Sequence, residues 1–104
     1  MARFDVYENP NLASKAEAPY LLDVQADLLD NLATRVVVPL IKISAMGKTA
    51  KHLNPRFTIN KEQLVMSTAE LAGIPVSDLG EKSGTLKERQ DEIIAALDFL
   101  LSGF

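Results

Sequence analysis

The chain has 104 residues, 47% of them hydrophobic, and a formal net charge of −3 at pH 7. This length fits a single domain, residues 1–104, with one modest hydrophobic core, and the apolar content excludes disorder of the whole chain. The absence of cysteine excludes disulfides, thiolate metal sites and cysteine nucleophiles. The slightly acidic balance, without any run of basic residues, argues against direct binding to a nucleic-acid backbone.

The N-terminal segment MARFDVYENP lacks the apolar stretch of a signal peptide. No apolar run approaches the roughly 20 residues that a membrane-spanning helix needs. We therefore expect a soluble, cytoplasmic protein that does not contact a membrane.

The N-terminal third of the chain predicts short strands separated by a loop. Apolar and polar residues alternate over residues 2–8, which predicts a half-buried strand. Phe4 and Val6 would face the core, and Asp5 and Tyr7 would lie on the other face. Residues 11–19 are small and polar, and they predict a connecting loop.

A strongly β-branched segment, Thr34–Ile43, predicts the most regular strand of the chain. Pro39 within it favours an edge position or a bulge, because proline cannot donate a hydrogen bond to a neighbouring strand. Further short strands are expected over residues 20–25, 56–59, 63–67 and 75–79, of which the middle two form a hairpin.

The C-terminal segment Thr85–Ser102 predicts one helix. Thr85 and Glu88 have the spacing of a capping box, and Gly103 falls where a helix end is commonly closed. One apolar stripe is formed by Leu86, Ile93, Leu97, Leu100 and Phe104. Short consecutive strands followed by a single helix predict an α+β fold, a small antiparallel sheet or barrel with a long C-terminal helix.

The polar residues indicate no catalytic constellation, no metal site and no cofactor. His52 is the only histidine and lacks a partner at a catalytic spacing, so we interpret it as a loop residue. Asp23, Asp27 and Asp30 do not match a calcium-loop pattern. We interpret them as residues that solubilise a turn and anchor backbone amides.

Three apolar residues of the predicted helix lie outside its main stripe. Ile94 and Leu101 fall on the shoulder of the stripe, and Phe99 lies well away from it. This pattern predicts a second contact surface, in a homodimer or with another protein. The alternative is that loops of the same chain cover Phe99.

Six segments in this order resemble the CcdB toxin family across nearly the whole chain. They are FDVYEN, LLDVQADLLDN, TRVVVPLI, HLNPRFTI, VMSTAELAGIPVSDLG and EIIAALDFLLSGF. The resemblance implies an SH3-like barrel with a long C-terminal helix, and a homodimer. It also implies a non-enzymatic toxin that binds the A subunit of DNA gyrase and traps it on cleaved DNA. A CcdA-type antitoxin would neutralise the toxin, and the two together would repress their operon, with the antitoxin contacting the operator DNA.

The resemblance also assigns a gyrase-binding face. The matching positions here are Leu28, Leu29, Asp98, Leu101, Ser102, Gly103 and Phe104. The best-known family pattern ends in tryptophan, glycine and isoleucine, whereas this chain ends in Ser102, Gly103 and Phe104. Asp98 replaces a neutral amide. Because aromatic residues often anchor interfaces, the serine weakens the expected affinity for gyrase.

Two other functions stay open at this point. One is a ribonuclease of the MazF/Kid type, for which Asp23 with Arg35 or Arg56 would supply a base and a cationic group. The other is a family member that has lost toxicity or changed its partner, which Ser102 favours.

Overall fold

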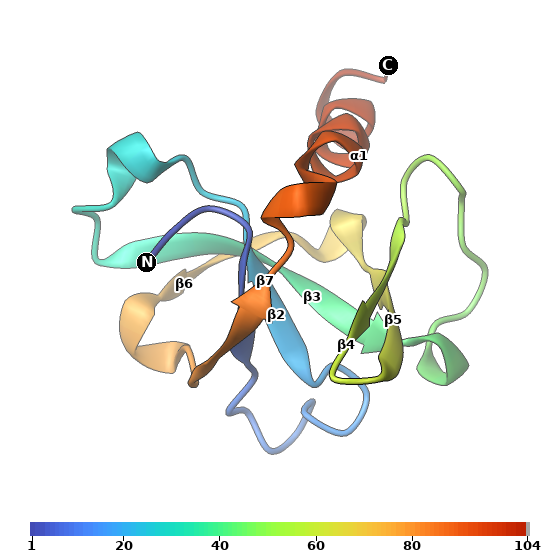
Figure 1. The fold of residues 1–104 in the computed structure, drawn as a ribbon, viewed down its shortest axis with the longest axis horizontal. Coiled ribbons are helices and arrows are strands. Elements are labelled where there is room, and N and C mark those ends of the chain that lie inside the picture. Colours follow the sequence, from blue (N-terminus) through green and yellow to red (C-terminus); the bar gives the residue numbers. More distant parts are fainter. Residues whose placement is uncertain (104) are drawn as a thin grey trace.

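The computed structural model describes residues 1–103 and arranges their strands in one curled antiparallel sheet, completed by a C-terminal helix (Figure 1). The strand order is β4-β5-β3-β2-β1-β7, and β6 also pairs with β3. The strands are β1 (Asp5–Glu8), β2 (Tyr20–Asp23), β3 (Thr34–Lys42), β4 (Arg56–Ile59), β5 (Glu62–Met66), β6 (Ala72–Pro75) and β7 (Lys82–Thr85), and the helix is α1 (Gln90–Ser102). The expected α+β architecture is confirmed.

Strand β3 is the centre of the sheet. It pairs with β2 on one side; on the other side, residues 34–37 pair with β6 and residues 40–42 with β5. Pro39 lies where the partner changes, and its carbonyl accepts the N–H of Ser67 at 3.0 Å. The predicted edge position or bulge is therefore wrong, because a gap between two partner strands accommodates a proline equally well.

The N-terminal strand is shorter and more deeply buried than predicted. Strand β1 begins at Asp5, and Asp5 and Tyr7 are as buried as Phe4 and Val6. The half-buried prediction is wrong because the second face of β1 is also buried, and there the Asp5 carboxylate accepts the N–H of Ala2 and the hydroxyl of Tyr7.

Strands β4 and β5 form the hairpin that the sequence predicts in the middle of the chain. The hairpin of β4 and β5 is confirmed, and its turn residues Asn60 and Lys61 both have positive φ, as two-residue hairpin turns require.

The strand predicted over residues 75–79 is wrong. The strand is β6, which ends at Pro75, and Val76–Asp78 form a 3-10 turn. Strand β7, which pairs with β1, was not predicted, because its residues KSGT do not alternate between apolar and polar.

The C-terminal helix begins later than predicted. Thr85 belongs to β7, a 3-10 turn follows over Lys87–Arg89, and α1 starts at Gln90. The Thr85 hydroxyl accepts the N–H of Lys87 at 3.2 Å, so the predicted capping box is wrong. The helix end is confirmed, since Gly103 has φ of 77° and donates its N–H to the Phe99 carbonyl at 3.0 Å.

The hydrophobic core lies between α1 and the facing side of the sheet. Ile93, Ala96 and Leu97 of α1 are buried against side chains that include Val38 and Leu40 of β3. The predicted stripe is confirmed for its buried members Leu86, Ile93 and Leu97, whereas Phe104 lies outside the described residues. The stripe fixes which side of α1 faces the sheet, and therefore which side is left for a partner.

Candidate functional site

The residues assigned to the gyrase-binding face fall on two elements. Leu28 and Leu29 belong to the 3-10 turn η1 (Asp27–Leu29). Asp98, Leu101, Ser102 and Gly103 form the exposed end of α1, and Phe104 lies outside the described residues. Both elements project from the same side of the sheet, η1 in cyan and α1 in red (Figure 1). Among residues 1–103, no hydrogen bond or ion pair joins the two groups.

Large apolar side chains are exposed on both elements. Leu28 is 93% exposed and Leu101 is 71% exposed, while Leu29 and Leu32 are about half exposed. Phe99 is 39% exposed, so loops of the same chain do not cover it fully. Sequence reasoning missed Leu32, because nothing in the pattern of a single leucine after an aspartate-rich turn distinguishes it from a core residue. Apolar side chains gathered at a surface are typical of a contact with another protein.

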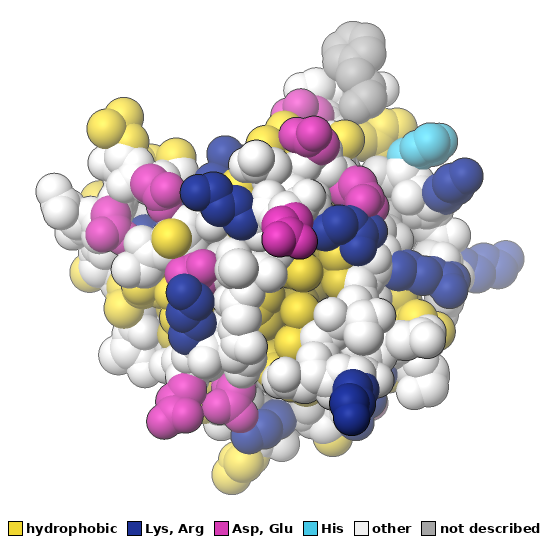
Figure 2. All heavy atoms as spheres, viewed as in Figure 1, with side chains coloured by type: hydrophobic (Ala, Val, Ile, Leu, Met, Phe, Trp, Pro, Cys, Tyr) yellow, Lys and Arg dark blue, Asp and Glu magenta, His cyan; other side chains and the backbone are white. Residues whose placement is uncertain are grey.

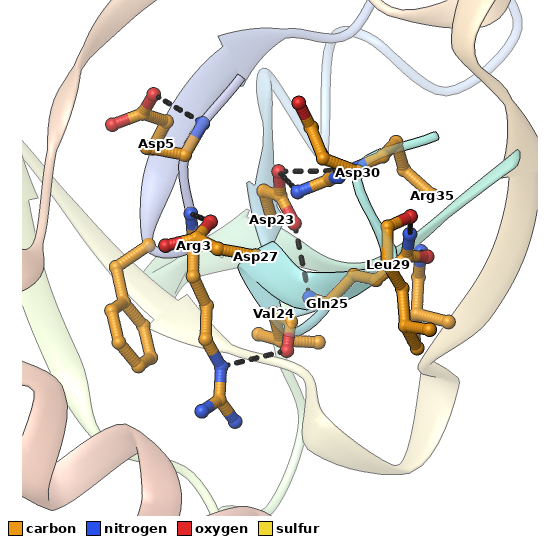
Figure 3. A network of polar contacts seen from close by, with 12 residues as sticks. Arg3, Asp5, Asp23, Val24, Gln25, Asp27, Leu29, Asp30 and Arg35 are labelled. Carbon is orange, nitrogen blue, oxygen red and sulfur yellow. Dashed lines mark hydrogen bonds and ion pairs between the residues drawn. The ribbon is translucent and has the colours of Figure 1, made fainter. Parts of the chain in front are cut away.

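A buried ion pair supports the turn that carries Leu28. The side chains of Asp23 in β2 and Arg35 in β3 are both fully buried, and the guanidinium donates two hydrogen bonds to Asp23 Oδ2, at 2.5 and 3.0 Å (Figure 3). The same guanidinium donates to Oδ1 of Asp30 at 2.9 Å. Arg35 therefore connects the interior of the sheet to the segment that follows η1.

Hydrogen bonds to Gln25 and to the N-terminal segment also hold the turn in place (Figure 3). The amide of Gln25 donates to the Leu29 carbonyl at 2.9 Å and accepts the N–H of Val36 at 3.0 Å. The carboxylate of Asp27 accepts the N–H of Arg3 at 2.7 Å. Because the polar groups of this segment are bound to the protein, its leucine side chains are left facing outward.

The three aspartates thus have different environments. Asp27 and Asp23 both accept backbone N–H groups, as expected, but Asp23 lies in the interior and does not solubilise a turn. Burial raises the pKa of the Asp23 carboxyl, and the hydrogen bonds from Arg35 and from the N–H of Gln25 act in the opposite direction. Among residues 1–103, no three His, Asp or Glu side chains are placed to hold a metal ion.

The buried acids also affect Tyr7, which lies on the same face of the sheet. Burial raises the pKa of the Tyr7 hydroxyl to about 12, and the negative charges of Asp5 and Asp23 add to the shift. The folded protein therefore holds the Tyr7 proton more tightly than the unfolded chain, in which tyrosine titrates near a pKa of about 10. The free energy of unfolding should fall as the pH rises from about 10 towards 12.

A spectrophotometric titration of tyrosinate absorbance, with urea unfolding at each pH, tests this expectation. The Tyr7→Phe variant should lose the late titration step and much of the alkaline loss of stability. Loss of the Tyr7 proton near the ordinary tyrosine pKa in the folded protein would contradict the burial of its hydroxyl.

A cleft of about 840 Å³ lies on the side of the sheet away from the core. Leu21, Val37 and Ile41 contribute to its floor, and the acids Glu17, Glu70 and Asp78 lie among its walls. No lysine, arginine or histidine is among the described residues that line it. The negative charge of these acids repels phosphate groups, so the cleft does not suit a nucleic acid.

The fold defines a class of small proteins with a curled antiparallel sheet and a C-terminal helix. Two solved structures of this class are similar to the chain: an endoribonuclease in complex with its cognate antitoxin and an endoribonuclease, each from a Mycobacterial species. The first has a TM-score of 0.76 and 16% identity, over 97% of this chain and 94% of that chain. The second has a TM-score of 0.71 and 17% identity, over 97% of this chain and 90% of that chain. At these identities the likeness shows the fold alone.

The family is shown by a separate comparison. Residues 3–103 match the family model described as CcdB protein, and the chain belongs to the CcdB family of toxins from toxin–antitoxin systems. The family and the fold class that the sequence resemblance implied are both confirmed. The described part of the chain contains no helix long and apolar enough to cross a membrane.

Proposed function

We propose that this protein poisons DNA gyrase: it binds the A subunit and traps the complex of gyrase with cleaved DNA. Membership of the CcdB family, whose toxins are non-enzymatic gyrase poisons, carries the proposal. The exposure of Leu28 and Leu101 supports it, because side chains that face solvent are available to a partner. In this proposal residues 1–104 act as one toxin domain, in the cytoplasm.

The proposed gyrase-binding residues are those that the family resemblance assigns. They are Leu28, Leu29, Asp98, Leu101, Ser102, Gly103 and Phe104. The six that belong to the described part of the chain are exposed, and Phe104 lies outside it. Ser102 provides a small hydroxyl where the family pattern has tryptophan, so Leu28 and Leu101 carry a larger share of the apolar contact. Asp98 adds a negative charge, which favours a basic patch on the partner.

We further propose that the protein is a homodimer and that a CcdA-type antitoxin neutralises it and co-represses the operon. Leu32 and Phe99 are exposed near the two site elements, and a second copy would bury such surface. The solved endoribonuclease that is bound to its cognate antitoxin shows that a protein of this fold can pair with an antitoxin. We expect the antitoxin to bind at or next to the end of α1 and to displace gyrase.

A ribonuclease mechanism is less well supported by the residues. The pair suggested from sequence, Asp23 with Arg35, is fully buried, so neither group can reach a scissile phosphate. Arg56 is exposed but belongs to β4, and β5 and β3 lie between β4 and the strand of Asp23. We therefore propose that the protein is not an enzyme.

A gyrase cleavage assay with two matched variants tests the proposal. Leu28 and Leu12 are 93% and 90% exposed, and only Leu28 lies in the proposed face. Wild-type protein and Leu12→Glu should convert supercoiled plasmid to cleaved DNA in the presence of gyrase, whereas Leu28→Glu should lose this activity. Both substitutions leave the core untouched, so the melting temperatures should be equal.

Three outcomes would contradict the proposal. Equal cleavage by Leu28→Glu and Leu12→Glu would show that η1 does not contact gyrase. Absence of cleavage with the wild-type protein would favour a family member with a lost or different target. Degradation of RNA by the purified protein without gyrase would instead favour the ribonuclease.

A further inference from the structure

A second concave site lies away from the proposed gyrase-binding face. It is a groove of about 680 Å³ between the loop that precedes β4 and the N-terminal half of α1. The ionisable residues among its lining are Lys51, His52, Arg56, Arg89 and Glu92. None of the described residues assigned to gyrase lines it, and it shares no described lining residue with the acidic cleft on the sheet.

Arg89 lines one wall of the groove, and several contacts hold its side chain in place. Its guanidinium contacts both carboxylate oxygens of Glu92, at 2.5 and 2.8 Å. It also lies 4.9 Å from the centre of the Phe57 ring and donates to the backbone carbonyl of Arg56 at 3.3 Å. These contacts neutralise Glu92, the one acidic side chain among the described residues of the groove, and hold the cationic group against α1.

The remaining charged side chains of the groove are open to solvent. Lys51 and Arg56 are exposed, and neither forms an ion pair with another side chain among residues 1–103. Figure 2 shows lysine and arginine side chains beside the single histidine, along one rim of the molecule. The groove is therefore locally positive in a protein whose formal net charge is −3.

We propose that this groove is a docking site for an acidic peptide segment of a partner, whose carboxylates are bound by Lys51 and Arg56. Arginine binds carboxylates bidentately, and Pro55 and Ala95 provide apolar walls for the rest of such a segment. The volume falls in the range of a small-ligand pocket, about 300–1,000 Å³, which fits a few residues. A DNA duplex instead needs a long basic stripe that contacts many phosphates.

A binding experiment with the wild-type protein and two variants tests the groove. The probe is a fluorescein-labelled hexaglutamate peptide, and binding is measured by fluorescence polarisation at low and high salt. Lys51→Glu and Lys15→Glu change the net charge equally, both sites are exposed, and only Lys51 lines the groove. We expect Lys51→Glu to weaken binding at least about tenfold and Lys15→Glu to change it far less.

His52 provides a second readout, because the ring of the only histidine gives a single set of NMR signals. The peptide should shift these signals in the wild-type protein and not in Lys51→Glu. Absence of binding, equal weakening in both variants, or unchanged His52 signals on binding would overturn the proposal. Tighter binding of a short oligothymidylate, lost in Lys51→Glu, would overturn it in favour of a nucleic acid.

This inference goes beyond the proposed gyrase poisoning and does not depend on it. Lys51→Glu should poison gyrase as the wild-type protein does, whereas Leu28→Glu should keep peptide binding. The two proposals can therefore fail separately.

Discussion

Replacing Arg35 by leucine should lower the free energy of unfolding by about 3–5 kcal/mol, because Asp23 would be left buried without its partner. A loss of this size approaches the whole stability of a small domain. Urea unfolding at neutral pH measures it. The variant should also loosen the segment after η1, since Arg35 alone bridges Asp23 and Asp30.

Two further variants separate the cost of leaving Asp23 buried without a partner from the cost of losing the contact with Asp30. Asp30→Asn keeps the buried pair, and because the Asp30 side chain is 51% exposed, it should cost at most about 1 kcal/mol. The double variant Asp23→Leu/Arg35→Leu removes both charges and should recover much of the stability that Arg35→Leu loses. A double variant as unstable as the sum of its two single variants would show that the pair is not coupled.

If the proposed function is correct, replacing Gly103 by glutamate should abolish gyrase binding while the protein stays folded and keeps its wild-type mass in solution. A β-carbon at Gly103 would meet no atom within 4 Å, so the larger side chain has room in the free protein. In the complex it would place an unpaired charge in the proposed contact, which costs several kcal/mol, or at least about a hundredfold in affinity. Gyrase binding, thermal melting and sedimentation are measured on the same sample.

Gly103→Ala is the matched control. Gly103 has φ of 77°, so any side chain there costs about 1–2 kcal/mol of stability, and both variants should melt slightly and equally below the wild type. Alanine should leave gyrase binding close to the wild-type value, since it adds only a methyl group and no charge. Wild-type binding by Gly103→Glu would show that the end of α1 does not contact gyrase.

Strong local patterns were sufficient to predict much of the fold. Strand β3 was predicted to within one residue because a β-branched run of this length has few other stable conformations. The hairpin and the helix end at Gly103 followed from turn and capping preferences. Strand β7 could not be predicted, because KSGT has no pattern of its own and is a strand only through pairing with β1.

The candidate site also combines features that the sequence could predict with features that only the structure shows. The resemblance assigned residues to η1 and to the end of α1, but only the structure shows that Leu28 and Leu101 are both exposed. The burial of Asp23 was not predictable, since a charged residue in an aspartate-rich segment is normally solvated. Its partner Arg35 is distant in sequence and adjacent in the sheet. The groove of Lys51 and Arg89 likewise joins segments that no local pattern connects.

The sequence by itself determined the composition of the core, the strand-to-helix order and the CcdB family, because these depend on periodicity and on ordered local segments. The tertiary structure alone decided which charges are buried and which leucines face solvent. Those properties depend on contacts between segments far apart in the chain, where a neighbouring arginine or the curl of the sheet determines the environment of each side chain.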